Sequence, residues 1–234
     1  MVRLFSVLAL GLLLSFTTVA APSFPSLSGR VVDKAGMLGS SAEQRISQQL
    51  QAHENATGNQ VVVVTLPDLQ GYDIATYGYQ LGRHWGIGQK GKNNGVLLIV
   101  AKKERSMRID VGYGLEGILT DAISANIIQT IIRPAFKRGQ FEQGIEAGTT
   151  AIIQALGGQY AMRKSSSKSR YSNWIIIPII LFLIFRGFGG GRGFGGGRRG
   201  GYYYGGGGGY SGRSGGGFSG GGGSFGGGGA SGGW

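Results

Sequence analysis

The chain has 234 residues, of which 49 are glycine, and a formal net charge of +12. Residues 22–160 contain 13 Lys and Arg against 11 Asp and Glu, a net charge of +2, so no nucleic-acid binding is expected at the folded domain. The absence of cysteine excludes disulfides, thiolate nucleophiles and cysteine-based metal sites.

The first 20 residues are typical of a secretory signal peptide. Arg3 precedes an apolar stretch over 4–14, and small residues follow up to Ala20. The apolar stretch is about half of the ~20 residues that a membrane span needs, which favours cleavage over anchoring. We therefore expect an exported protein with a signal peptide over 1–20.

The stretch over 27–158 alternates between strand and helix patterns. Ser40 and Glu43 have the spacing of a capping box at the start of a helix. Two apolar, β-branched runs predict strands covered on both faces. The predicted order is an extended segment over 30–33, a helix from Ser40, strands over 60–66 and 96–101 around a helix over 73–85, a return strand over 106–111, and helices over 120–133 and 142–156 separated by Pro134 and a turn over 138–140. This order predicts an α/β fold, a three-layer α/β/α sandwich with a mixed central sheet.

The connections between these elements predict which loops meet. Strands 60–66 and 96–101 are joined by a helix, so they should run parallel with a right-handed crossover. The strand over 106–111 follows a short turn and should run antiparallel to its predecessor. The loop over 112–117 should therefore return to the edge of the sheet at which 93–95 enters.

Oxygen-bearing side chains in or beside these loops are the candidate metal ligands. They are Asp33, Asn94, Glu116 and Asp121. Carboxylate, amide and carbonyl oxygens suit a hard divalent cation, Ca²⁺ or Mg²⁺. Asp33 belongs to the set only if its short strand ends at the same edge. Asp121 also fits an ordinary first-turn acid of a helix, and Asn94 an ordinary turn residue.

No residue pattern assigns a catalytic residue or an organic cofactor site. Gly112, Gly114 and Gly117 form a GxGxxG pattern, but no further strand completes a dinucleotide-binding unit. His53 is expected on a solvated helix face and His84 in a packing or interface position. Neither histidine suggests a Ser-His-Asp arrangement.

A second apolar block follows the domain, after a basic linker over 159–170. Extended to 171–188, this block has 18 residues, with aromatic residues at one end and arginine at the other. We expect it to form one transmembrane helix. The signal peptide then places residues 21–170 outside the cell membrane, in the periplasm or its equivalent, and the C-terminal tail in the cytoplasm.

The tail over 189–234 is predicted to be disordered because glycine dominates it. Its arginine and tyrosine residues leave RNA binding or self-association open beside the role of a spacer.

Several motifs, taken in order, resemble the TPM-domain family. They are Val32-Asp33 with 36–38, then 60–65, 85–88, 93–98, 112–117 with Asp121, 134–136 and 139–141. The resemblance covers 27–158 and implies an α/β/α fold with extracytoplasmic membrane anchoring. Plant thylakoid-lumen relatives are linked to photosystem II repair and reported as acid phosphatases, and bacterial relatives are reported to bind divalent cations.

Two functions are compatible with this sequence. The first is a membrane-anchored, divalent-cation-binding module for interaction, assembly or membrane-protein maintenance, with envelope or membrane proteins as partners. It is favoured because no histidine and no second acid is placed as a base at the expected site. The alternative is a metal-assisted acid phosphatase, in which the cation polarises a phosphoryl oxygen of a monoester and activates water.

Overall fold

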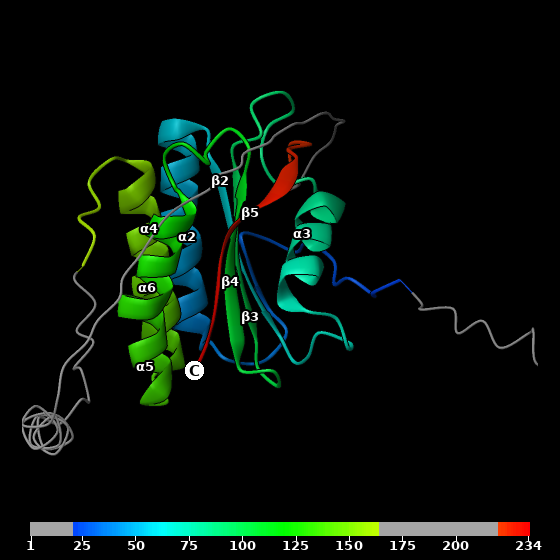
Figure 1. Ribbon diagram of the computed structural model, residues 1–234, viewed down its shortest axis with the longest axis vertical. Helices are drawn as coiled ribbons and strands as arrows, with labels where there is room; N and C mark the ends of the chain where they lie inside the picture. The colour runs from blue at the N-terminus through cyan, green and yellow to red at the C-terminus, as the bar shows by residue number, and fades with distance from the viewer. Residues whose placement is uncertain (1–20, 164–219) are drawn as a thin grey trace, which may run out of the picture.

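The computed structural model describes residues 21–163 and 220–234. In this part of the chain a five-stranded mixed sheet carries helices on both faces (Figure 1). The strands, in their order across the sheet, are β1 (Val31–Asp33), β2 (Gln60–Leu66), β3 (Gly95–Ala101), β4 (Ser106–Gly112) and β5 (Phe225–Gly233). β1, β2 and β3 are parallel, whereas β4 is antiparallel to both β3 and β5. The predicted mixed α/β fold and the predicted directions of β2, β3 and β4 are confirmed.

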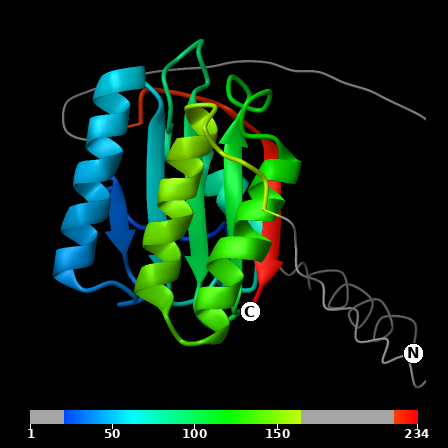
Figure 2. The same cartoon turned by 90° about the vertical axis from the view of Figure 1, so that its left-hand side faces the viewer.

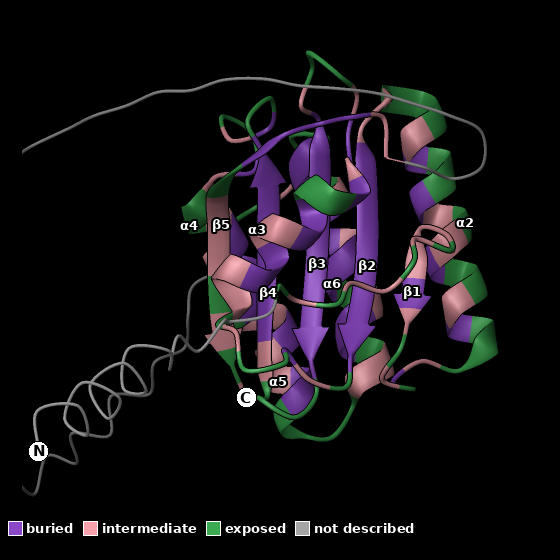
Figure 3. Cartoon of the chain, turned by 90° about the vertical axis from the view of Figure 1, so that its right-hand side faces the viewer, coloured by how far each residue is buried: buried purple, intermediate pink, exposed green. Residues whose placement is uncertain are grey.

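The two faces of the sheet are covered unequally. Most helices lie on one face, which Figure 2 shows, and one helix covers the other. The first face carries α2 (Ser40–Thr57), α4 (Asp121–Ile127), α5 (Arg133–Lys137) and α6 (Phe141–Leu156), and the second carries α3 (Ile74–Trp85). Along β3, Leu98 packs in the first core and Leu97 in the second, as the two-residue period of a strand requires. Every residue of β2 and β3 is buried (Figure 3).

The two helical connections between the parallel strands lie on opposite faces of the sheet. β1 joins β2 through α2, and β2 joins β3 through α3. β1, β2 and β3 are parallel and lie side by side in chain order, so both connections move across the sheet in the same direction. Because α2 and α3 lie on opposite faces, one crossover is right-handed and the other is left-handed.

Two local predictions about the helices are wrong. α2 begins after Gly39, which has no side-chain cap, so Ser40 and Glu43 do not form a capping box. Pro134 does not end a helix, because α4 continues through a π-helical turn, η1 (Ile128–Ile132), into α5, whereas the predicted turn over 138–140 does separate α5 from α6. The wider turn, in which Arg133 donates its N–H to the Ile128 carbonyl, accommodates a proline that would clash in a regular α-helix.

The prediction of a disordered tail is wrong for residues 220–234. This segment contains β5, and β4 supplies the hydrogen-bonding partners that its glycine composition does not reveal. The predicted signal peptide over 1–20, the span over 171–188 and the rest of the tail lie outside the described residues. Within 21–163 and 220–234, no helix is both long and apolar enough to cross a membrane.

Candidate functional site

The loop after β4 lies against the loop before β3, as the strand directions predicted. Gly114 donates its N–H to the Asn93 carbonyl over 3.1 Å, and a side chain at Gly114 would overlap the Lys92 carbonyl. We call residues 86–95 and 112–121 the amino-end rim, because β2 and β3 begin at this edge.

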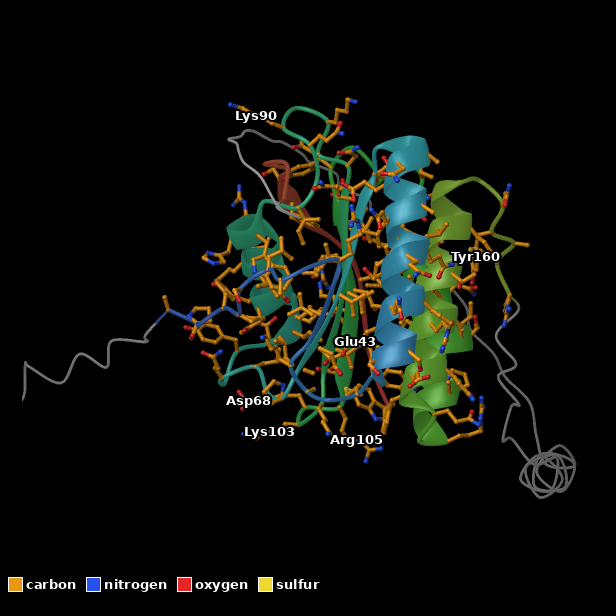
Figure 4. The ribbon with its side chains drawn as sticks, turned by 180° about the vertical axis from the view of Figure 1, so that it is seen from behind. Glu43, Asp68, Lys90, Lys103, Arg105 and Tyr160 are labelled. Atoms are coloured by element: carbon orange, nitrogen blue, oxygen red, sulfur yellow. The ribbon has the colours of Figure 1, made fainter. Side chains whose placement is uncertain are left out.

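Asp33 lies at the opposite edge of the sheet, the carboxyl-end rim. In Figure 4, Lys90 marks the amino-end rim, whereas Asp68 and Lys103 lie at the other end of the molecule. The Asp33 carboxylate accepts hydrogen bonds from the backbone N–H groups of Met37 at 3.1 Å and Leu38 at 2.9 Å. It also accepts a hydrogen bond from the Thr65 hydroxyl. Asp33 therefore closes the turn between β1 and α2 and does not join the other three predicted ligands.

Asn94 is buried in the amino-end rim, where its side-chain amide ties the loop before β3 to the loop before β2. Its Oδ1 accepts from the Gln89 N–H at 2.8 Å. Its Nδ2 donates to the Gly58 carbonyl at 2.8 Å and to the Asn59 side chain at 3.3 Å. These bonds give Asn94 a structural role, and ligation of a metal through Oδ1 would compete with the Gln89 bond.

Glu116 and Asp121 are the two predicted ligands that the structure brings together. Burial, and secondly the charge of Asp121, raise the pKa of Glu116 above its ordinary value. Asp121 is the first residue of α4, whose N-cap is Thr120. Among the described residues, no group of three or more His, Cys, Asp or Glu side chains could hold a metal ion.

The C-terminal strand contacts this carboxylate pair. Gly229 donates its N–H to Asp121 Oδ1 over 2.6 Å. A Cβ at Gly228 would lie 2.5 Å from Glu116 Oε1, so a side chain at Gly228 would displace the Glu116 carboxylate. The segment of residues 220–234 is therefore part of the site.

Two aromatic residues anchor this segment on opposite faces of the sheet. Phe225 is 1% exposed and lies in the core beneath α3, where a Cβ at Gly82 would be 3.0 Å from its ring. Trp234 packs edge-to-face on Phe136 with ring centroids 4.7 Å apart, and it also contacts Phe141. Sequence analysis missed both anchors, although Phe225 and Trp234 are the large apolar residues among residues 220–234.

A buried ion pair forms the middle of the same contact. Arg108 Nε donates to Asp110 Oδ1 over 2.5 Å, and its other nitrogens donate to Ser231 Oγ at 2.9 Å and the Gly227 carbonyl at 2.8 Å. Burial raises the pKa of Asp110 to about 7, although Arg108 opposes this shift. The Arg108 guanidinium thus joins the domain to both the backbone and the side chains of the C-terminal segment.

The comparison with protein families identifies this domain. The model of the TPM domain matches residues 31–155, more than half of the chain. The chain belongs to the TPM domain family. The match ends before the C-terminal segment, so the strand that completes the sheet lies outside the matched region. No curated protein sequence matches the chain.

Three solved structures are similar to this chain. The N-terminal domain of a protein from P. gingivalis, determined by NMR, is 34% identical over 56% of this chain and 83% of that one, with a TM-score of 0.53. An NMR structure of a protein from Bizionia argentinensis is 21% identical over 56% of this chain and 90% of its own, with a TM-score of 0.46. The N-terminal domain of a protein from Corynebacterium glutamicum is 22% identical over 64% and 93%, with a TM-score of 0.45.

The TPM domain has a separate crevice of about 330 Å³ at the carboxyl-end rim. Its walls include Lys34, the residue after β1, and Pro67, the residue after β2. The segment around Ser23 also lines it. The chain leaves β1 and β2 toward opposite faces here, which is where open α/β sheets generally form ligand crevices. The Gln70 and Tyr77 side chains already hydrogen-bond the Ser23 backbone. The crevice is therefore partly filled by the N-terminal segment of the described domain.

Neither histidine of the TPM domain belongs to the amino-end rim. His53 is 8% exposed on α2 and contacts Thr57, so the prediction of a solvated residue is wrong. His84 packs against Phe24 with ring centroids 5.1 Å apart, as expected for a packing position. Acid–base chemistry at the rim would therefore have to use groups other than histidine.

Proposed function

We propose that this protein is an extracytoplasmic interaction module in which the TPM domain binds a glycine-rich strand at the edge of β4. The observation that carries the proposal is the docking of β5, which combines strand pairing with a pocket for Phe225 and an aromatic platform for Trp234. Addition of a strand to a free sheet edge is a common mode of peptide recognition, in which the backbone supplies affinity and side-chain pockets supply specificity.

The contacts favour a ligand that is poor in side chains. Side chains at Gly226 and Gly229 would overlap Tyr113 and the Ile109 carbonyl, respectively. A Cβ at Gly232 would approach Ile128 to 2.5 Å. Glycine at these positions is therefore a recognition feature of the segment.

A divalent cation enters the proposal as a competitor of the docked strand. Glu116 and Asp121 offer the oxygen ligands that Ca²⁺ and Mg²⁺ prefer, and water would complete the coordination. Asp121 uses Oδ1 to bind the Gly229 N–H. Cation binding through that oxygen and docking of Gly229 would oppose each other, so each should lower the affinity for the other.

Export by residues 1–20 remains part of the proposal, and so does attachment of residues 171–188 to the membrane, but without a single full crossing. Docking adds a restriction, because a strand can pair with β4 only on the same side of the membrane. A single crossing with a cytoplasmic tail and the docked β5 therefore exclude one another. We propose that residues 220–234 share the extracytoplasmic compartment with the TPM domain.

Peptide binding tests the recognition directly. A labelled peptide of residues 220–234 is added to the mature chain truncated after residue 163, whose fold is checked by circular dichroism. We expect saturable binding by fluorescence anisotropy, and at least tenfold weaker binding of the Phe225→Ala peptide. Absence of saturable binding to a folded domain contradicts the interaction function.

Metal-assisted acid phosphatase activity is the alternative function. A cation held by Glu116 and Asp121 would supply Lewis-acid chemistry, but the C-terminal segment would have to leave first. The test measures hydrolysis of a chromogenic phosphate with Ca²⁺ or Mg²⁺ by the wild-type chain, Glu116→Gln and the matched Glu43→Gln, whose acid lies on α2. Turnover lost only in Glu116→Gln supports a phosphatase, and absent or equal turnover in all three excludes this site.

A further inference from the structure

The C-terminal segment reaches β4 through a long connection. Fifty-six residues separate Arg163 from Gly220, the two ends of the described ranges. At ~3.4 Å per residue, this length could span at most about 190 Å. The chain is therefore long enough to deliver its end to its own domain or to that of a neighbouring copy.

β5 is held by few side-chain contacts. Six of its nine residues are glycine, and each glycine loses more conformational entropy on ordering than alanine would. The stabilising contributions come from the ladder with β4, the two aromatic anchors and the hydrogen bonds of Arg108 and Asp121. This balance favours a strand that can leave and return while β1 to β4 stay folded.

Release of β5 would leave a specific edge exposed. Arg108 would lose its bonds to Gly227 and Ser231, and the pocket beneath α3 would lose Phe225. An open β4 edge is a template for another strand. The segment whose anchors and glycine positions fit this edge is the C-terminus of the same sequence.

We propose that the C-terminal segment of one copy docks on the β4 edge of a second copy, so that exchanged strands link the chains. This inference rests on the proposed strand-binding function. Docking within one chain and docking between copies use the same contacts and differ through the local concentration of the strand. One-way exchange is a head-to-tail contact that extends from copy to copy, whereas reciprocal exchange closes a dimer.

Introduced cysteines can separate the two arrangements, because the natural chain has none. Ser106 and Gly233 are partners in the register of β4 and β5. Full mature chains carrying Ser106→Cys and a first tag are mixed with chains carrying Gly233→Cys and a second tag, in liposomes, and oxidised. We expect a disulfide-linked product that carries both tags.

Two controls establish that the product reports strand docking. Adding Phe225→Ala to the Gly233→Cys chain should lower the yield of mixed product at least tenfold. Lys90→Cys in place of Ser106→Cys should give only the collisional background, because Lys90 lies at the other end of the molecule (Figure 4). A yield that is insensitive to Phe225→Ala overturns the proposal.

A chain that carries both Ser106→Cys and Gly233→Cys distinguishes the two levels of inference. A monomeric disulfide in this chain, with no mixed product at any protein density, shows docking within one copy and overturns exchange. If the double variant forms neither a monomeric nor an intermolecular disulfide, strand docking itself is wrong and the proposed function fails as well. Circular dichroism of each variant confirms that the compared chains are folded.

Discussion

Every residue of β2 and β3 is buried, whereas β5, in the same sheet, consists mostly of glycine and buries only Phe225. The central strands lie between two apolar cores and are stabilised by side-chain burial. β5 is stabilised by backbone pairing, by one anchor at each end and by polar contacts in between. The sheet therefore has a centre held between two apolar cores and an edge held mainly by backbone pairing and two aromatic anchors.

The largest expected effect is a loss of stability on substitution in the centre of the sheet, at β3. Leu98→Ala removes a fully buried side chain from β3 and should lower the free energy of unfolding by about 2–5 kcal/mol. Urea unfolding of the mature chain measures this change. Ile118→Ala, at a side chain that is 45% exposed, is the control and should change stability by no more than about 0.5 kcal/mol. Similar losses in both variants would contradict the stated role of the centre.

A pH-dependent effect should arise where the centre meets the edge. The pKa of buried Asp110 rises from 3.8 to about 7, so the folded chain retains a proton that the unfolded chain releases. This contribution to stability is complete below pH 3.8 and is lost as the pH rises through about 7. We expect the Tm of the wild-type chain to fall between pH 5 and 8 more steeply than that of Asp110→Asn. Parallel pH profiles would rule out Asp110 as the source.

A smaller effect is expected at the carboxyl-end rim. Asp33→Ala removes the acceptor for two backbone N–H groups and should lower the free energy of unfolding by about 1–2 kcal/mol. If Ca²⁺ or Mg²⁺ binds at Glu116 and Asp121 as proposed, the increase in Tm that the cation produces should be the same in Asp33→Ala as in the wild-type chain, because Asp33 lies at the opposite rim. Loss of this increase in Asp33→Ala alone would restore Asp33 to the cation site.

The smallest effect on global stability is expected from substitutions that weaken the docking of β5 on β4. Gly229→Ala would overlap the Ile109 carbonyl, whereas Gly227→Ala has open space. Both positions have a positive φ, so their comparison isolates the overlap. Hydrogen exchange by NMR should show at least tenfold lower protection of β5 amides in Gly229→Ala than in Gly227→Ala, with β2 and β3 unchanged. Equal protection of β5 in the two variants would mean that this close approach is not required.

The sequence predicted the centre of the sheet better than its edge. β2 was predicted with its observed bounds, because a long β-branched run can be covered on both faces in few ways. The meeting of residues 93–95 with residues 112–117 followed from strand direction alone. Asp33 was misplaced because a three-residue strand carries no sign of its direction.

The missed strand has a different physical cause. Composition describes what a segment can bury by itself, and residues 220–234 can bury little. β5 is ordered by contacts that belong to β4, α3 and α5, which no local pattern in the tail encodes. The acidic pair was found through its loops, but the strand that contacts it could not be found in this way.

The path of the C-terminal segment also determines how it would respond to mechanical load. Gly220 and Gly222 lie against the amino-end rim, and Gly222 donates its N–H to the Gly86 carbonyl over 2.7 Å. Tension arriving from the preceding chain would therefore reach the Phe225 pocket before the rest of the ladder, and Trp234 last. We predict that Phe225→Ala lowers the rupture force of this contact more than Trp234→Ala in single-molecule pulling through residue 220. The opposite ranking would show that load is carried from the Trp234 end.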